Sequence, residues 1–233
     1  MVLKPLIRWT IGPVSKSGFQ ILRHSVTAIK RLYGEKFKYT ICFNNLSNRQ
    51  KKFIEGLDCH LLDQSDHQET LSLTPPTNSG GPAWKLYPPR ISINTTEIFM
   101  DNDLVIFNES WFMEKFTDDI FYTESLLRSY GRFNSQIEEG FNLNSGLVVI
   151  PPGLDLGKHL DDNIQKFKIN DWTNHFDEQA LFASVVQDLK NIMIPLTDVG
   201  VDSLDGKYGV HFIGANSGKD ELWSRYLIEK FKL

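Results

Sequence analysis

Apolar residues in the first third of the chain alternate between the spacing of a strand and that of a helix. Residues 6–14, LIRWTIGPV, form a short apolar run closed by Gly and Pro, which indicates a strand. Residues 18–34, GFQILRHSVTAIKRLYG, place apolar side chains mostly three and four positions apart and end in glycine, as an amphipathic helix does. The run KYTICF at 38–43 predicts a second strand.

The next segments continue this alternation. Residues 47–57 open on Ser47, a good helix N-cap, and reach Gly56, a residue typical of helix ends, while HLLDQ at 60–64 predicts a third strand. The last third adds predicted helices at 176–189 and 219–231 and predicted strands at 191–196 and 208–214. This order predicts an α/β fold class, a single Rossmann-like domain whose mostly parallel central sheet is flanked by helices. Such a sheet gathers ligands at the carboxyl ends of its strands.

One long polar segment interrupts the pattern. Residues 65–83, SDHQETLSLTPPTNSGGPA, contain two prolines in a row and a Gly-Gly pair, which indicates a loop. Loops of this length in compact domains are often functional. The sequence leaves two interpretations open, a mobile lid and an ordinary surface connection.

Composition excludes several classes of protein. The chain has 233 residues, of which 41% are hydrophobic, and a net charge of -4, which argues against a nucleic-acid partner. Cys42 and Cys59 lack metal-site spacing and are expected to be buried free thiols in a reducing compartment. The first residues lack a signal-peptide pattern, and no apolar run is long enough for a transmembrane segment. A cytoplasmic location is therefore expected.

Two aspartates interrupt the apolar run EIFMDNDLVIF at 97–107. Asp101 and Asp103 fall where the predicted strand ends, at the edge where ligands of an α/β sheet bind. If the segment is extended, the two side chains point the same way, and a divalent cation would relieve their repulsion. Asp-Asn-Asp is also common in polar turns between short strands. The sequence alone leaves both interpretations open.

Four further motifs follow a fixed order along the chain. They are Lys85-Leu86, sixteen positions before Asp101, then Asn144-Ser145-Gly146 in FNLNSGLVVI, Glu178-Gln179 in FDEQALF, and His211 in HFIGANSGKDELW. Together with the D-x-D motif, this order resembles the nucleotide-sugar transferases of the GT-A fold. It specifically resembles glycosyltransferase family 8, the group that includes glycogenin and bacterial lipopolysaccharide hexosyltransferases. The resemblance spans nearly the whole chain.

The resemblance implies a single GT-A domain over residues 1–233, with a nucleotide-binding half at 1–107 and a half for the acceptor and donor sugar at 108–233. It implies transfer of a hexose from a nucleotide diphosphate sugar, a UDP-sugar, with retention. The acceptor stays open between a glycan, a lipid-linked sugar and a protein, and the oligomeric state is equally open. The implied metal ligands are Asp101, Asp103 and His211. Two carboxylates and one imidazole suit Mn²⁺ better than Mg²⁺, although another divalent cation would also fit.

The resemblance also assigns the other site residues. The nucleotide-sugar-binding residues would be Thr10, Lys85, Asn102, Asn144, Ser145, Gly214 and Lys219. The catalytic group would comprise Glu178, Asp177 and Gln179. Its proposed task is to hold the donor sugar or to stabilise the positive anomeric centre that forms as the diphosphate leaves.

The chain departs from the family pattern at three points. The family's Asp-Gln is Glu-Gln here, which leaves either Asp177 or Glu178 as the acid. The C-terminal motif is longer than in the family and lacks its proline, which bears on the role of Lys219. The turn after the first strand agrees with the family only at Thr10 and Gly18.

Each site residue also has a structural interpretation. Lys85 could be a solvated lysine beside Trp84, Glu178 a first-turn carboxylate favoured by the helix dipole, and His211 a core residue. As a metal ligand, His211 should lose the cation when it protonates below its ordinary pKa of about 6.5. Two other functions stay open: a catalytically inactive GT-A module that binds a nucleotide or a partner, and a nucleotidyltransferase. The second usually needs a glycine-rich phosphate loop, of which residues 12–18 are only a faint version.

Overall fold

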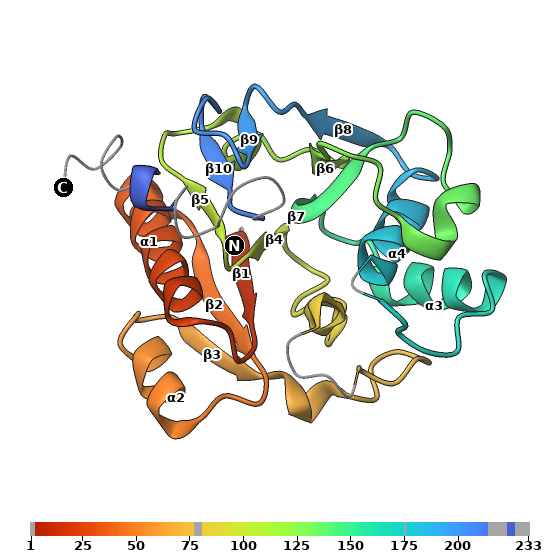
Figure 1. Ribbon diagram of the computed structural model, residues 1–233, viewed down its shortest axis with the longest axis horizontal. Coiled ribbons are helices and arrows are strands. Elements are labelled where there is room, and N and C mark those ends of the chain that lie inside the picture. Colours follow the sequence, from red (N-terminus) through yellow and green to blue (C-terminus); the bar gives the residue numbers. More distant parts are fainter. Residues whose placement is uncertain (1–2, 77–80, 175, 214–222, 227–233) are drawn as a thin grey trace.

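The computed structural model describes residues 3–76, 81–174, 176–213 and 223–226, and its central element is a seven-stranded sheet (Figure 1). In spatial order its strands are β3 (His60–Asp63), β2 (Lys38–Phe43), β1 (Leu6–Ile11), β4 (Glu97–Asp101), β7 (Leu143–Ile150), β6 (Ile120–Glu124) and β8 (Asn191–Ile194). All neighbouring pairs are parallel except the two that involve β7. The expectation of a mostly parallel sheet is therefore confirmed.

Among the described residues, the helices α1 to α4 flank this sheet, two on each side (Figure 1). They are α1 (Lys16–Tyr33) and α2 (Asn48–Glu55) on one side, and α3 (Leu156–Lys166) and α4 (Asp177–Val186) on the other. Ser47 caps α2 in a reciprocal capping box with Gln50, as the sequence predicts for a helix starting there. The sequence analysis did not identify α3 or the strand β6.

A second, three-stranded sheet lies beside the first (Figure 1). Its strands, in spatial order, are β5 (Leu104–Ile106), β10 (Gly209–His211) and β9 (Val199–Val201). The chain passes from β4 to β5 through Asn102 and Asp103, which form a turn. The turn interpretation of Asp-Asn-Asp is thus correct, and the segment is not a continuous strand. The same turn carries the chain from the large sheet to the small one.

The long polar segment begins and ends in short 3₁₀ turns, Gln64–His67 and Pro82–Leu86. Three other 3₁₀ turns occur among the described residues, Gly34–Lys36, Trp111–Met113 and Gly131–Gln136. Residues 77–80 lie outside the described part of the chain, so the lid interpretation remains a prediction. The predicted helix at 219–231 also lies mostly outside it, although residues 223–226 are helical. None of the described helices is long and apolar enough to cross a membrane.

A buried charge network fixes the segment that follows the polar loop. Arg8 in β1 and Glu97 in β4 are both fully buried, and their side chains are 2.9 Å apart. The Arg8 guanidinium also donates hydrogen bonds to the carbonyl oxygens of Lys85 and Pro88. Arg90 pairs with the other carboxylate oxygen of Glu97 at 3.2 Å. Residues 85–90 are therefore tied to the two central strands, and this tie determines where Lys85 lies.

Candidate active site

Three potential metal ligands converge at the carboxyl edge of the sheets. Asp101 is the last residue of β4, Asp103 lies in the turn to β5, and His211 ends β10. One ligand atom from each residue lies within 4.8 Å of the others. His211 Nε2 is 3.1 Å from Asp103 Oδ1 and 3.5 Å from Asp101 Oδ2. These donors suit a divalent cation of the Mn²⁺ type, so the residues fit the implied metal.

The absence of a side chain at Gly146 makes room for this cluster. A Cβ atom added there would lie 2.2 Å from His211 Cε1 and 2.6 Å from its Nδ1, distances that real Cβ atoms do not show. Gly146 belongs to β7, and Asn144, two residues earlier in the same strand, accepts a hydrogen bond from the Gly146 N–H at 2.7 Å. The Asn-Ser-Gly motif therefore brings β7 against the imidazole, which explains the glycine in physical terms.

Lys85 is buried and lies at the centre of the site. Its Nζ is 2.7 Å from Asp101 Oδ1 and 3.2 Å from Glu178 Oε1, and it also donates to Ser145 Oγ at 3.2 Å. Burial alone would lower the pKa of Lys85, but the two carboxylates outweigh it and raise that pKa. Lys85 is therefore charged and is not the solvated lysine of the structural interpretation.

Glu178 faces the site from the first turn of α4. Ser145 Oγ donates to Glu178 Oε2 at 3.2 Å, and Gln179 accepts the Ser145 N–H at 3.4 Å. Burial raises the pKa of Glu178 to about 7, although the charge of Lys85 opposes that rise. This carboxyl group is thus poised to exchange a proton near neutral pH.

Asp177, the other candidate acid, lies outside this pocket. Its Oδ2 accepts the N–H of Thr173 at 2.8 Å and pairs with Arg132 at 3.0 Å, so it anchors the loop before α4. The structure brings Glu178 to Lys85 and does not bring Asp177 there. The geometry therefore favours Glu178 as the acid of the site.

Hydrogen bonds to the carboxylates control the protonation of the cluster. Burial lowers the pKa of His211, but its contacts with Asp101 and Asp103 outweigh burial and raise it to about 9. Burial raises the pKa of Asp101, yet Lys85 and His211 hold it below its usual value. Without a cation, the imidazole is therefore protonated at neutral pH, and its own positive charge offsets the negative charges of the two aspartates.

Two pockets meet at this cluster. The smaller, of about 260 Å³, lies over the ends of β1 and β4 and is lined by Thr10, Gly12, Val14, Ser15, Gly18, Asn44, Gly81, Pro82, Lys85, Asp101, Asn102 and Asp103. The larger, of about 480 Å³, contains Lys85, Asp101, Asp103, Asn144, Ser145, Glu178, Gln179 and His211. Pro82, Lys85 and the two aspartates line both pockets. Gly214 and Lys219 lie outside the described residues.

The larger pocket also contains residues that the sequence analysis missed. Ser125, Leu126, Leu127 and Ser129 follow β6, a strand whose apolar run is too short to stand out between polar neighbours. Gln179 Nε2 donates to the carbonyl of Ser129 at 3.0 Å, which ties this loop to α4. No sequence motif marks these positions.

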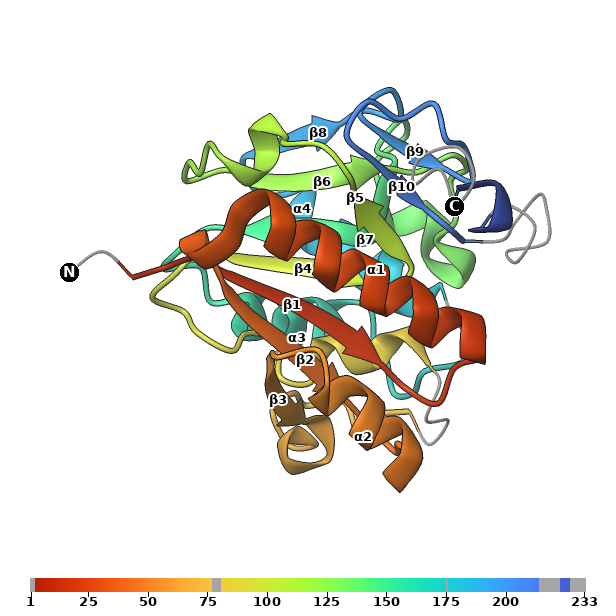
Figure 2. The same cartoon turned by 90° about the vertical axis from the view of Figure 1, so that its left-hand side faces the viewer.

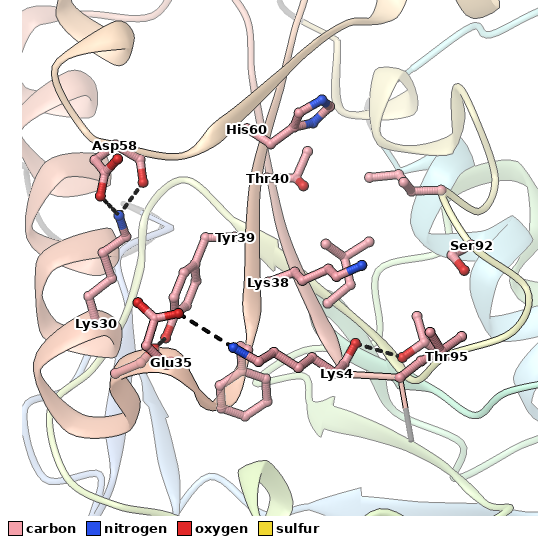
Figure 3. A pocket seen from close by; sticks show the side chains of 15 residues that line it. Lys4, Lys30, Glu35, Lys38, Tyr39, Thr40, Asp58, His60, Ser92 and Thr95 are labelled. Carbon is pink, nitrogen blue, oxygen red and sulfur yellow. Dashed lines mark hydrogen bonds and ion pairs between the residues drawn. The ribbon is translucent and has the colours of Figure 1, made fainter. Parts of the chain in front are cut away.

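A separate cavity of about 820 Å³ opens at the opposite edge, by the amino ends of β1 and β2 (Figure 3). Its charged groups mostly pair with one another, as Lys30 does with Asp58 and Lys4 with Glu35. Among the described residues, the acidic and histidine cluster of the other edge has no counterpart here. The candidate active site is therefore the carboxyl edge.

Several glycosyltransferases of known structure share this architecture. The galactosyltransferase LgtC, solved with donor and acceptor sugar analogs, superposes with a TM-score of 0.62 at 10% identity over 94% of both chains. The bifunctional glycosyltransferase WbbM superposes with a TM-score of 0.63 at 10% identity over 97% of this chain. The chain has a GT-A fold. The resemblance in the sequence is confirmed at the level of the fold.

The structural likeness covers 94% to 97% of this chain but only part of some matched proteins. This chain covers 51% of WbbM and 62% of GlyE from Streptococcus pneumoniae TIGR4, which superposes with a TM-score of 0.59 at 10% identity. No protein-family model matches the chain, and no curated protein matches it in sequence. The shared property is thus the GT-A fold.

Proposed function

We infer that the protein is a glycosyltransferase that uses a divalent cation, most suitably Mn²⁺, and a nucleotide diphosphate sugar. The observation that carries this proposal is the convergence of Asp101, Asp103 and His211 at the junction of two pockets. In a nucleotide sugar, the diphosphate lies between the nucleoside and the sugar, just as the cluster lies between the smaller and the larger pocket. The GT-A fold, which LgtC shares while bound to donor and acceptor analogs, supports the assignment.

In this proposal the smaller pocket binds the nucleoside and the larger one binds the sugars. Thr10 and Asn102 offer polar groups on the nucleotide side, and all lining residues of that pocket lie between positions 10 and 103. This distribution supports a nucleotide-binding half at 1–107. Asn144, Ser145 and Gln179 offer amide and hydroxyl groups to the donor sugar. UDP as the nucleotide and retention at the anomeric carbon are proposed from the resemblance to family 8.

The chain's own residues would act on the charges of the reaction. Lys85 supplies a fixed positive charge at the junction, where the diphosphate would lie. Glu178, on the sugar side, would stabilise the positive anomeric centre or hold a sugar hydroxyl. A bound divalent cation supplies further positive charge that offsets the charge developing on the departing diphosphate. Asp177 would act indirectly, by fixing the start of α4 through Arg132.

The proposed roles of Gly214 and Lys219 in donor binding, and a glycan, lipid-linked or protein acceptor, remain predictions. A cytoplasmic location is proposed on the sequence arguments alone. An inactive nucleotide-binding module is the alternative that the test below separates from an enzyme.

The test is a thermal-shift and hydrolysis screen of nucleotide sugars with Mn²⁺ or with a chelator. A ligand that binds only the folded state raises the melting temperature by mass action, so a UDP-sugar should stabilise the protein only when Mn²⁺ is present. Slow release of UDP in the same samples would show catalysis. Asp103→Asn should lose both effects and keep the fold, while Asp66→Asn, the same change at an exposed residue, should keep both.

Three outcomes are distinct. Cation-dependent binding with UDP release supports a transferase. Binding without release in any donor and acceptor combination supports the inactive module. Equal stabilisation in Mn²⁺ and in chelator would remove the metal site from the proposal.

A further inference from the structure

The basic residues of this acidic protein are concentrated near its N-terminus. Residues 1–54 contain eleven Lys or Arg and a single acidic residue, Glu35, for a formal charge of +10. Residues 55–233 contain 14 basic and 28 acidic residues, for a charge of -14, and the two parts together give the net charge of -4. A charge asymmetry of this size indicates a surface that meets a polyanion.

The fold gathers these cations on one side of the molecule. Figure 2 shows α1 and α2 together on the side that faces the viewer. The two helices carry seven basic residues, Lys16, Arg23, Lys30, Arg31, Arg49, Lys51 and Lys52. Helix α1 has no acidic residue, and α2 has one, Glu55 at its last position. We call this side, defined by those seven residues, the basic face.

Several of these cations have no ion-pair partner, although Arg23 lies over the Phe53 ring at 5.4 Å. Lys16, Arg23, Arg49 and Lys52 are exposed, and none of them forms an ion pair within the described part of the chain. By contrast, Lys30 and Lys51 pair with aspartates. The unpaired cations therefore add positive potential to the surface without stabilising the fold through ion pairs.

The positions of two of these cations run against helix stability. Lys16 and Arg49 lie in the first turns of α1 and α2, where the helix dipole favours acidic side chains, and neither first turn has one. A groove of about 450 Å³ between the helices is lined by Lys16, Arg23 and Arg49, with no carboxylate among its lining residues. Cations at these positions reduce the stability of both helices, which is consistent with a role in binding rather than in folding.

The basic face adjoins the candidate active site without covering it. The groove between α1 and α2 and the smaller site pocket share Val14, and both lie near the carboxyl end of β1. In Figure 2 the arrowhead of β1 and the first turn of α1 lie at the same edge of the molecule. A flat polyanion on the basic face would thus sit beside the pocket openings and leave them accessible.

We propose that the basic face of α1 and α2 docks the protein on a membrane surface that contains anionic lipids. The face spans two adjacent helices and spreads its charge over both, which fits the extended negative potential of a bilayer. Among the described residues, none of the large apolar side chains that are exposed is aromatic, and the aromatic rings of the groove, Phe19 and Phe53, are buried or half-buried, which favours a lipid surface over stacked single-stranded nucleic acid. Docking is electrostatic and reversible, and it requires neither a donor sugar nor a divalent cation.

The test is co-sedimentation of the full chain with vesicles. One set contains phosphatidylcholine alone, and the other contains about one third phosphatidylglycerol, a composition with a negative surface potential. The protein should bind only the anionic vesicles, and binding should fall steeply between low salt and about 0.5 M NaCl because salt screens surface charge. Lys16→Gln/Arg49→Gln/Lys52→Gln should reduce the partition coefficient about fivefold for each cation removed.

A matched control carries Lys158→Gln/Lys166→Gln/Lys190→Gln. These lysines are exposed: Lys158 and Lys166 lie on α3, on the opposite side of the sheet from α1 and α2 (Figure 1), and Lys190 directly precedes β8, the edge strand farthest from β3. The control has the same net charge as the test variant and should bind anionic vesicles like the unchanged protein. Equal loss in both triple variants would reduce the effect to net charge and overturn the assignment of the basic face.

Two further outcomes would overturn the proposal. Equal binding to both kinds of vesicle would show that anionic lipid is not recognised. Failure to bind anionic vesicles, together with tight binding of single-stranded RNA that the test variant loses, would assign the face to nucleic acid. The Asp103→Asn variant should bind vesicles normally, so a failed glycosyltransferase assignment and a failed docking proposal give different results.

Discussion

Gly146 is the residue on which the position of His211 depends. In Gly146→Ala the new methyl group would overlap the imidazole, so the ring or strand β7 must shift. We expect the affinity for Mn²⁺ to fall at least about tenfold, which corresponds to about 1.4 kcal/mol of binding free energy. Isothermal titration calorimetry with Mn²⁺ measures this change directly.

The matched control for that substitution is Gly157→Ala in α3. A Cβ atom there meets its nearest neighbours at 3.5 Å, which is an ordinary contact, and alanine favours a helix over glycine. The control should bind Mn²⁺ normally and gain up to about 1 kcal/mol of stability. Unchanged Mn²⁺ affinity in Gly146→Ala would show that His211 is not a ligand.

The raised pKa of His211 changes the expected pH dependence of the site. From the ordinary imidazole value, the sequence predicts loss of the cation only below about pH 6.5. In the structure the folded pKa is about 9, so a cation must displace a proton throughout the neutral range. In the cation-free protein, the protonated ring stabilises the fold. This contribution to the free energy of unfolding is complete below about pH 6.5 and is lost as the pH rises through about 9.

We therefore expect Mn²⁺ binding at pH 7.5 to release close to one proton per cation. Titration calorimetry in two buffers of different ionisation enthalpy measures the number of protons released. A cadmium titration at pH 8.5 gives the same number at a higher pH. The affinity should still rise between pH 7 and 9. The His211→Asn variant should release few protons, and an affinity that is flat above pH 6.5 would contradict the raised pKa.

At the level of residues, the motifs predicted which side chains meet and not how they are charged. The motifs pointed to Lys85, Asp101, Asn144 and Glu178, and the fold brings these residues together because each lies at or near the end of its element. Their mutual burial decides the protonation states, and burial depends on packing that one sequence does not reveal. The choice between Asp177 and Glu178 likewise needed the position of Arg132.

The buried pair of Arg8 and Glu97 joins two strands to the segment that carries Lys85. In Arg8→Met, the fully buried Glu97 still pairs with Arg90 but loses the closer ion pair with Arg8. We expect a loss of about 3 kcal/mol in the free energy of unfolding, because removal of one partner leaves a buried charge undercompensated. Urea denaturation followed by circular dichroism measures this loss.

The control for that prediction is Lys4→Met, which breaks the exposed pair with Glu35. Exposed pairs contribute little because water and salt screen them, so the urea midpoint should stay unchanged. Equal effects of Arg8→Met and Lys4→Met would show that the buried network is not a major support of the fold.

At the level of elements, strong periodicity was decisive and weak periodicity was not. The predicted helix at 18–34 corresponds to α1, and KYTICF coincides with β2, because each has a clear apolar pattern and end signals. Helix α3 was missed because only four of its eleven residues are buried, and most of the others are charged. The strand predicted at 208–214 contains β10, but the small sheet itself was missed, because its strands have three residues each and are recognised only by their pairing.

On the scale of the whole molecule, the candidate metal site joins the two sheets. Asp101 belongs to β4 of the large sheet, His211 to β10 of the small one, and Asp103 to the turn between the sheets. Strand β10 contributes only three residues to its sheet, so few backbone hydrogen bonds hold this end of the chain. A cation bound by all three residues would therefore link β10, which few hydrogen bonds hold, to β4 in the centre of the large sheet.

Hydrogen exchange followed by mass spectrometry tests this cross-link. Adding Mn²⁺ should slow amide exchange in peptides that cover β9 and β10 more than in peptides from the centre of the large sheet, because local opening of the small sheet must then break ligand bonds. Peptides from α3, on the far side, should exchange at the same rate with and without the cation (Figure 1). The Asp103→Asn variant should show no Mn²⁺ effect in β10 and should otherwise keep the exchange pattern of the unchanged protein. Protection confined to the large sheet would mean that His211 takes no part in binding the cation.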